Sequence, residues 1–228
     1  MNKNLIRNKC VICSSKLKHI LTLKNYPVYM GASSDQNFLL ENQTWCGCEN
    51  CGCIQLKKLL PLKLVYKKFH HEIVGNVWEK HHEDFKNFLL KYSSPIILEI
   101  GGSDGYLASK ALKSDKIKQW NIVEPNIPKK RKKNKKLKFI NSYIEKIDIK
   151  KFKNFTFVHS HTIEHFYNPK NILKKISNLQ NIGDKMIFSV PNLDKYLKQK
   201  FINTIDFEHT YLLTESILDI FLYNHHYK

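Results

Sequence analysis

The sequence predicts an α/β protein: a doubly wound, mostly parallel sheet preceded by a small cysteine-rich domain. Three observations support this fold class. Apolar runs alternate with helical segments after Pro95, a glycine-rich turn follows the first of these runs, and all six cysteines lie before residue 54. Strands that alternate with helices form βαβ units and hence parallel sheets. With 42% hydrophobic residues, the 228-residue chain can bury a substantial core.

Each element after Pro95 is identified by its periodicity and by the residues that end it. Short apolar runs closed by turn residues indicate buried strands, and apolar residues recurring every three or four positions indicate helices. The first strand ends at the glycine-rich turn, and Gly183-Asp184 leads into the last one. The expected strands are 96–100, 120–125, 137–140, 155–160 and 185–190, and the expected helices are 106–112, 169–179 and 214–222.

The end of the chain limits the size of this sheet. Six residues follow the helix at 214–222, which is room for one short strand but not for a hairpin, because strands average about five or six residues. We therefore expect about five parallel strands with an open edge, and an open edge needs protection. A second copy of the chain in a homodimer, the N-terminal domain, or further residues of a longer chain would provide it.

Composition divides the chain into three expected parts: a domain at 1–65, a linking helical segment at 66–94, and the α/β domain at 95–228. Between the cysteine pairs we expect a loop of mixed polarity, and residues 54–56 read as a short strand. Helical spacing runs from residue 62 to 92, and Ser93-Ser94-Pro95 ends it.

The glycine-rich turn, with Gly101, Gly102 and Gly105, lies where the first strand meets a helix. Glycines there let a ligand approach the backbone closely. The spacing differs from that of a dinucleotide site, and the carboxylate of Glu99 would repel a pyrophosphate. It suits a cationic sulfonium ligand that carries an ammonium group. Glu124, which ends the next strand, is placed to bind both hydroxyls of a ribose. An unrelated α/β domain with tight turns is the alternative.

These segments resemble the class I S-adenosylmethionine-dependent methyltransferases over residues 96–191. The resemblance implies a Rossmann-like fold and S-adenosylmethionine as the cofactor of the domain at 95–228. The matching runs are 97–105, 123–125, 157–165 and 183–191. The implied cofactor residues are Glu99, Gly101, Gly102 and Asp104 at the methionine end, Glu124 at the ribose, Tyr143 and Ile144 at the adenine, and His159 and Ser160 beneath the sulfonium.

The clustered cysteines indicate a metal site, because disulfides are rare in a reducing cytoplasm. A structural zinc ion binds four thiolates, usually as two C-x₂₋₄-C pairs, which predicts a zinc-ribbon-like domain. Four thiolates leave no open position, so a catalytic zinc is disfavoured. The predicted ligands are Cys10, Cys13, Cys48 and Cys51.

The second pair is chosen among four cysteines. Gly52 after Cys51 forms a tight knuckle in which backbone N–H groups face the thiolates, so Cys46 and Cys53 are left outside the site. Reduced free cysteines and an iron–sulfur cluster are the alternatives.

The cysteine cluster also resembles the zinc-binding domain that precedes sugar methyltransferases of the deoxysugar C-methyltransferase type. Residues 48–56 carry this resemblance, with Cys10-x-x-Cys13 upstream, and residues 66–71 fall where the family places a tyrosine-rich segment beside its substrate. Most of those tyrosines are absent here. A looser resemblance connects the chain with capsule-locus methyltransferases, including those of O-methyl phosphoramidate decoration. Together they imply a nucleotide-linked sugar or phosphoramidate precursor of a surface polysaccharide as acceptor.

Two Glu-His dipeptides are candidates for the acceptor side of the reaction: Glu164-His165 and Glu208-His209. Methyl transfer aligns donor and acceptor and removes a proton from a hydroxyl or carbon acid, a task that histidine performs near neutral pH. In the sugar C-methyltransferases a Glu-His pair after the fifth strand lies at the substrate. The resemblance implies that His209, with Glu208, is the base. His165 either positions the acceptor or caps or packs a helix.

The net charge of +18 raises the question of nucleic-acid binding. Residues 129–138 hold eight basic residues and no acid, so the remaining chain carries +10. This is either a solvated basic loop or an anion-attracting surface. No apolar run reaches the ~18 residues of a membrane span, and the N-terminus lacks the apolar segment of a signal peptide. We therefore expect no membrane contact and a cytoplasmic location.

Three functions are compatible with these features: a small-molecule methyltransferase, an rRNA methyltransferase with an N-terminal zinc module, and a non-catalytic zinc-ribbon binding protein. The Pro-Pro-aromatic motif of amino-directed nucleic-acid enzymes is absent after the fourth strand, where 159–162 reads His-Ser-His-Thr. The intact cofactor acids disfavour the third function. The small-molecule enzyme is the leading prediction, and nucleic acid is not the expected partner.

Overall fold

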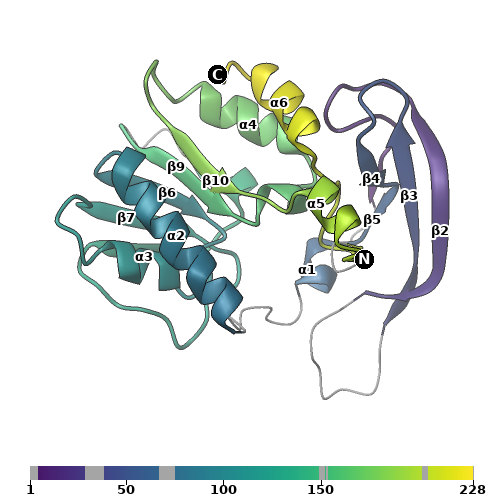
Figure 1. The fold of residues 1–228 in the computed structure, drawn as a ribbon. Helices are drawn as coiled ribbons and strands as arrows, with labels where there is room; N and C mark the ends of the chain where they lie inside the picture. The colour runs from purple at the N-terminus through teal and green to yellow at the C-terminus, as the bar shows by residue number, and fades with distance from the viewer. Residues whose placement is uncertain are drawn as a thin grey trace. The chain divides into compact units, whose positions relative to one another are not determined.

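The computed structural model describes residues 5–28, 39–66, 75–148, 152, 154–201 and 205–227. They form two compact units (Figure 1). Unit 1 contains Met1–Phe69, Ile163–Leu173 and Val190–Lys228, and unit 2 contains His70–Thr162 and Lys174–Ser189. This division differs from the three consecutive ranges expected from composition, because the C-terminal segments belong to the same unit as the cysteines. Residues 67–71 of the stretch expected beside a substrate lie outside the described part.

Unit 2 is built on a five-stranded sheet in which every pair of neighbours is parallel, in the order β10-β9-β6-β7-β8. This confirms the predicted number and direction of the strands among the described residues. The fifth strand in sequence, β10, is one edge of this sheet, and a partner for that edge stays a prediction. The strands are β6 (Ile96–Ile100), β7 (Gln119–Val123), β8 (Leu137–Ile140), β9 (Thr156–Ser160) and β10 (Met186–Ser189).

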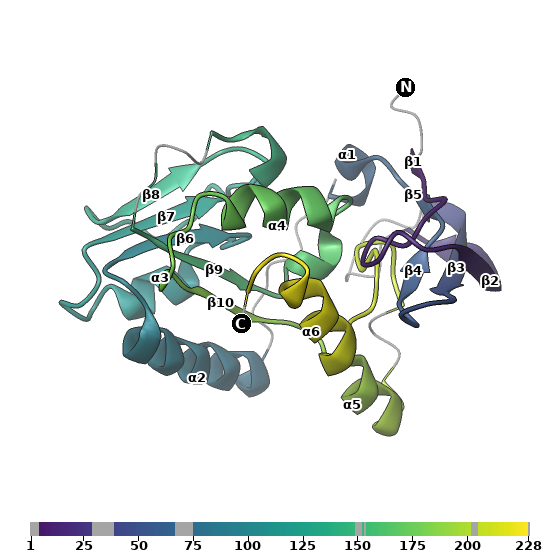
Figure 2. The same ribbon diagram turned by 90° about the horizontal axis from the view of Figure 1, so that it is seen from above.

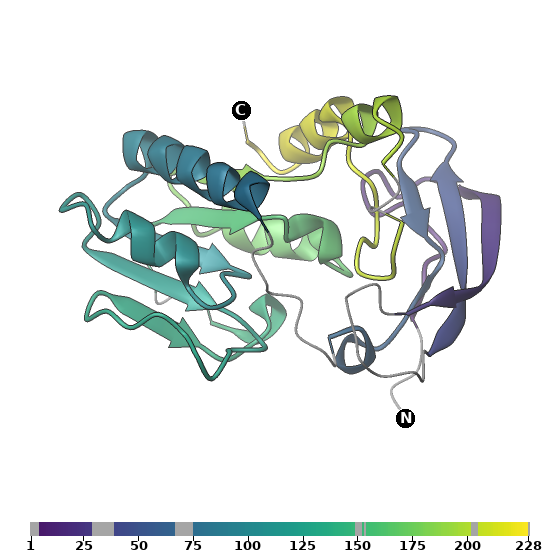
Figure 3. The same ribbon diagram turned by 60° about the horizontal axis from the view of Figure 1, so that its bottom comes forward.

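Helices cover both faces of the sheet. On one face lie α2 (Asn76–Tyr92) and α3 (Tyr106–Ala111) (Figure 3). The opposite face carries α4 (Pro169–Ser177) (Figure 2). Under α2 and α3, side chains such as Leu89 and Trp120 are wholly buried. Strands covered on both faces read as continuous apolar runs, which is why the sequence located them well.

The long helix predicted at 62–92 is two helices, α1 (Leu62–Val65) and α2. The backbone of Gly75 has φ +85°, outside the helical region, and α2 begins at the next residue. The prediction therefore placed the start of the long helix too far toward the N-terminus.

Antiparallel strands form the N-terminal part of unit 1. A three-stranded sheet has the order β2-β3-β4, and a separate pair joins β1 to β5. The long pairing of β2 with β3 replaces the loop that we expected between the cysteine pairs. It was missed because the side chains of β2 are mostly exposed and two register shifts interrupt its alternation. The strands are β1 (Leu5–Ile6), β2 (Leu17–Pro27), β3 (Leu40–Cys48), β4 (Ile54–Leu56) and β5 (Lys58–Leu59).

Segments from the second half of the chain complete unit 1. They are the 3₁₀ helix η3 (Ile163–His165), α5 (Leu193–Lys198) and α6 (Glu215–Tyr223). Phe207 packs into a core with Trp45 and Leu56. Within the described ranges, no helix combines the length and the apolar composition that a membrane span requires.

Arg7 connects these segments from inside unit 1. Its side chain is only 6% exposed, and its guanidinium donates to the carbonyl oxygens of Phe166 and Tyr167 at 3.3 and 3.1 Å. It also donates to Thr210, at the backbone oxygen and at Oγ1. Burial lowers the pKa of Arg7 to about 10, so it remains charged at neutral pH. A buried charge is tolerated when such hydrogen bonds replace its hydration.

Arg7→Met keeps most of the side-chain volume but removes every one of these donors. We expect the free energy of unfolding to fall by about 2 kcal/mol, the scale of hydrogen bonds to a charged group. Urea denaturation measures this change, with the exposed Lys9→Met as the control for loss of a positive charge. Equal stability of the two variants would contradict the assignment.

Candidate functional site

The predicted cofactor residues of unit 2 gather at one edge of its sheet. The carboxyl ends of parallel strands meet at the same edge, where open α/β sheets bind their ligands. The turn after β6 and the end of β7 lie next to each other, because Gly101 N donates to the carbonyl of Val123 at 3.0 Å. Glu99, on β6, pairs in register with Ile122 of β7.

The glycine-rich turn is needed for close packing at this edge. Gly101 has φ +74°, and a Cβ there would lie 2.6 Å from Oγ1 of Thr162. A Cβ on Gly102 would lie 2.7 Å from a carboxylate oxygen of Glu99. Gly105, with φ +84°, adopts the left-handed conformation at the start of α3. Larger residues at these positions would separate the turn from the neighbouring strands.

Glu99 is a buried carboxyl group, 3% exposed, at the end of β6. Trp120 donates its indole N–H to Glu99 Oε2 at 2.7 Å. Burial raises the pKa of Glu99 to about 7, although this hydrogen bond favours the ionised form. The group therefore changes protonation near neutral pH, and a cationic ligand would favour its charged form.

Glu124 is held in place by the backbone on both sides of it. Ser103 N and Asn126 N donate to its two carboxylate oxygens at 3.3 and 2.9 Å. These two bonds fix the orientation of the carboxylate at the end of β7. Asp104 accepts from Tyr106 N at 2.9 Å at the start of α3.

The remaining predicted cofactor residues differ in their exposure. Tyr143 precedes the 3₁₀ helix η1 (Ile144–Lys146), and partial burial raises its pKa, while Ile144 is buried. His159 is 0% exposed and stacks on Phe188, with ring centroids 4.9 Å apart. Burial lowers its pKa to about 3, so the ring is neutral. It packs inside unit 2, and its place beneath a sulfonium stays a prediction.

Ser160 belongs to a group of side chains that the sequence analysis missed. Its Oγ lies 2.7 Å from that of Ser189 and 3.1 Å from His81 Nε2. The centroid of the His161 ring lies 5.0 Å from that of Trp78 and 5.3 Å from that of His81. The backbone of His161 has a φ of +50°. Burial lowers the pKa of His81. Trp78 and His81 lie three residues apart on α2, a spacing that could have indicated a shared face.

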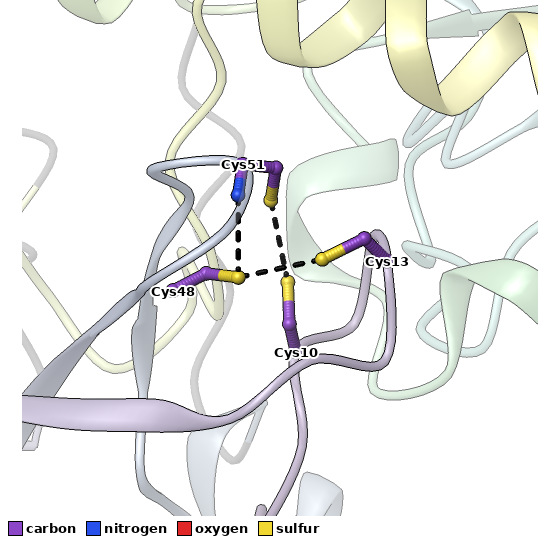
Figure 4. A group of neighbouring side chains, drawn as sticks. All are labelled: Cys10, Cys13, Cys48 and Cys51. Atoms are coloured by element: carbon purple, nitrogen blue, oxygen red, sulfur yellow. Dashed lines mark hydrogen bonds between the residues drawn. The ribbon is translucent and has the colours of Figure 1, made fainter.

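The four predicted metal ligands converge in unit 1. Figure 4 shows their sulfur atoms pointing toward one another, and each of the four lies within 4.8 Å of the other three. The Sγ atoms of Cys10 and Cys51 are 3.6 Å apart, and those of Cys13 and Cys48 are 3.3 Å apart. Sulfurs around one zinc ion at about 2.3 Å are roughly 3.8 Å apart, so the arrangement fits a tetrahedral metal.

Backbone N–H groups face the thiolate of Cys48, as expected for the knuckle predicted at Cys51-Gly52. Asn50 N and Cys51 N point at Cys48 Sγ from 3.4 and 3.5 Å, and Gly52 has the positive φ of +74° that the turn requires. Cys46 and Cys53 are also buried, and neither belongs to the group of four, although the thiol of Cys53 interacts with that of Cys10. The choice of Cys48 and Cys51 is therefore supported by geometry.

His209 and His165 lie together in unit 1, with ring centroids 5.0 Å apart. The partner of His209 is Asp206, whose Oδ2 is 2.7 Å from His209 Nδ1. Asp206 Oδ1 also accepts from the backbone N–H groups of His209 and Glu208. Sequence analysis missed Asp206. The three-residue spacing in Asp206-Phe207-Glu208-His209 was the available signal.

Glu164 and Glu208 flank the other histidine. His165 Nδ1 lies 2.9 Å from the hydroxyl of Tyr66 and 3.8 Å from Glu208, and its Nε2 lies 3.9 Å from Glu164. The Glu208 carboxylate thus lies near His165. The sequence analysis predicts Glu208 as the partner of His209, but among the described contacts that partner is Asp206.

Charge interactions within this cluster are strong because it is buried. Burial raises the pKa of Glu164, 2% exposed, to about 7 against the opposing effect of His209. Burial, the largest single effect, disfavours the charged form of His209, but the hydrogen bond with Asp206 and the charges of Asp206, Glu164 and Glu208 together outweigh it and raise the pKa to about 9. At neutral pH the His209 ring is therefore protonated on both nitrogens, and it must lose one proton before it can act as a general base.

The pKa of Glu99 makes stability depend on pH in unit 2. Between about pH 4.5 and about pH 7 the folded chain keeps a proton on Glu99 that the unfolded chain has lost, so stability falls as the pH rises. Glu99→Gln removes this dependence. Across that interval, wild type should lose on the order of 3 kcal/mol more free energy of unfolding than the variant.

Urea unfolding at the two ends of the interval measures this difference, with the exposed Asp115→Asn as control. The same pH dependence in wild type and Glu99→Gln would show that Glu99 is not the titrating group.

No protein-family model matches the chain, and none of the curated proteins matches it in sequence. Solved structures do match. The plantazolicin methyltransferase BpumL in complex with SAH has a TM-score of 0.51 at 15% identity, over 64% of this chain and 67% of that one. The same enzyme with a monoazolic desmethylPZN analog and SAH gives 0.50 at 16% identity, over 64% and 61%.

A chain from the complex of the Haloferax volcanii Trm112 methyltransferase activator with a methyltransferase has a TM-score of 0.50 at 11% identity, over 62% of this chain and 69% of that one. Identities this low establish likeness of fold alone. The five-stranded parallel sheet of unit 2, with helices on both faces, is thus the Rossmann-like fold found in methyltransferases.

Proposed function

We propose that this chain is an S-adenosylmethionine-dependent methyltransferase. The observation that carries the proposal is the carboxylate of Glu124, fixed at the end of β7 by Ser103 N and Asn126 N beside the glycine-rich turn. A carboxylate held in this way suits the two hydroxyls of the cofactor's ribose. Bound to the protein, the cofactor supplies an electrophilic methyl group on a sulfonium.

Glu99 favours this cofactor over a dinucleotide. It is buried behind the turn that a pyrophosphate would have to approach, and its negative form would repel that group. An ammonium or sulfonium group nearby would instead stabilise the ionised carboxylate. BpumL, a protein of similar fold, binds SAH in both of these structures.

The acceptor that we propose is a small anionic molecule: a nucleotide-linked sugar or phosphoramidate precursor of a surface polysaccharide. The resemblance of residues 48–56 and 96–191 to sugar and capsule-locus methyltransferases supports this class. The basic residues 129–138 support it as well, because Lys132 N donates to the carbonyl of Asp104 at 2.9 Å and so ties this loop to the glycine-rich turn. Positive charge there attracts phosphates.

The acceptor-side residues remain those predicted: His209 with Glu208, and His165. Asp206 joins them because it orients His209. A mass-spectrometric screen of nucleotide sugars and phosphoramidates for the gain of one methyl group tests the acceptor class. A steep salt dependence of RNA binding, with methylation of RNA, would support the rRNA enzyme instead.

Glu124→Ala should weaken the binding of S-adenosylhomocysteine by roughly 1.5–3 kcal/mol, or about 10- to 150-fold, because hydrogen bonds to a charged group are lost. Calorimetry of the full chain measures this, and Asp115→Ala, which removes an exposed carboxylate of the same unit, serves as control. Tighter binding of NAD than of S-adenosylhomocysteine by wild type would overturn the proposal.

The four-cysteine site is proposed to hold one structural zinc ion per chain, in a reducing compartment such as the cytoplasm where thiolates persist. Metal analysis of protein purified without chelator should find this zinc. Cys48→Ser should lose it, whereas Cys46→Ala should retain it. Zinc-free wild-type protein, or loss of zinc in the Cys46 variant alone, would contradict the assignment.

A further inference from the structure

We propose that Glu164, His165 and His209 bind a second metal ion, a divalent cation of the first transition series. One ligand atom from each of the three residues lies within 4.8 Å of the others. Ligands of a single ion at about 2.1 Å are typically about 3 to 3.5 Å apart, so small side-chain rotations would complete the coordination. This site lies wholly in unit 1. An ion bound to Nε2 of His209 occupies the lone pair that a general base uses, so metal binding would replace the role of base proposed for His209.

The backbone fixes the two segments that carry these ligands. Thr210 N donates to the carbonyl of Glu164 at 2.9 Å, and Thr210 Oγ1 reaches the same oxygen at 3.2 Å. The hydroxyl of Tyr211 donates to the carbonyl of Ile163. Residues adjacent to all three ligands are thus joined directly, and the ligands approach one another before any ion arrives.

Hydrogen bonds outside the cluster orient both imidazole rings for coordination. Asp206 accepts from His209 Nδ1 at 2.7 Å, which places the lone pair of the neutral ring on Nε2. The Tyr66 hydroxyl contacts His165 Nδ1 at 2.9 Å, and His165 Nε2 faces Glu164 Oε1 at 3.9 Å. A carboxylate or hydroxyl behind a ligating histidine is the usual outer shell of a metal site.

The donor set distinguishes this site from the cysteine cluster. Four thiolates select soft or borderline ions such as zinc, whereas two imidazoles and a carboxylate suit zinc, iron, cobalt, nickel and manganese ions in the divalent state. Three protein ligands also leave coordination positions open, as in catalytic metal sites.

A pocket beside the cluster gives these open positions access to a ligand. It measures about 230 Å³ including its mouth and is lined by Glu164 and His209 together with Pro191, Leu193, Tyr211, Leu212 and Leu213. That volume includes open solvent, and the enclosed part has room for about one water-sized group. It therefore suits one oxygen-bearing group, a hydroxyl or carboxylate, which the cation would coordinate and, for a hydroxyl, make more acidic.

Manganese(II) is the appropriate probe, because its preference for oxygen and nitrogen ligands keeps it away from the zinc-filled thiolates. We would titrate the full zinc-loaded chain with Mn²⁺ and follow the unbound ion by electron paramagnetic resonance. One Mn²⁺ per chain is expected. Glu164→Gln and His209→Ala should each abolish this binding, and Asp206→Asn should weaken it about 10- to 100-fold, as loss of an outer-shell partner does.

His19→Ala, an exposed histidine of the same unit, is the matched control and should bind Mn²⁺ as wild type does. The zinc content of the cysteine site shows that each variant is folded. Unchanged Mn²⁺ affinity in Glu164→Gln would overturn the proposal. So would a zinc-loaded wild-type chain that binds no further metal ion when Mn²⁺, Co²⁺ or additional Zn²⁺ is supplied. Binding of S-adenosylhomocysteine is measured separately, so failure of the metal site and failure of the proposed function are distinguishable.

Discussion

A single buried cation joins three distant parts of unit 1: the guanidinium of Arg7 bonds to the backbone at Phe166, Tyr167 and Thr210. Because its hydration is lost on burial, these carbonyl groups must stay close to it. They flank the segments that carry Glu164, His165 and His209. The acid–histidine cluster therefore depends on a residue from the N-terminus that touches none of the three ligands in the described contacts.

Unit 2 depends on a different constraint, the common direction of its strands. Parallel strands deliver their carboxyl ends to one edge, and two such ends carry Glu99 and Glu124. Glycines at 101, 102 and 105 allow the following turn to pack against those strands with no intervening side chain. Burial then gives the two carboxyl groups different environments. Glu99 titrates near neutral pH, whereas Glu124 is held by backbone N–H groups.

The two candidate metal sites of unit 1 illustrate how ligand chemistry separates functions. The cysteine site is closed, with four sulfurs around one point and backbone N–H groups facing them. The acid–histidine site has three protein ligands and an adjoining pocket. A closed set stabilises a fold, and an open set leaves room for a further ligand. The chain thus offers one closed and one open set of candidate ligands.

The sequence by itself determined the five parallel strands, the glycine-rich turn and the four converging cysteines. In each case the signal is local: an apolar run, a spacing of glycines, or a C-x-x-C pair. Only the tertiary structure decided that β2 and β3 form a long hairpin, that Asp206 is the partner of His209, and that the C-terminal segments fold with the cysteines. The hairpin and the place of the C-terminal segments rest on the mostly exposed strand β2 and on contacts between residues far apart in the chain, where neighbouring residues carry no periodic pattern. The pair of Asp206 and His209 is local, but a spacing of three residues does not by itself show that two side chains meet.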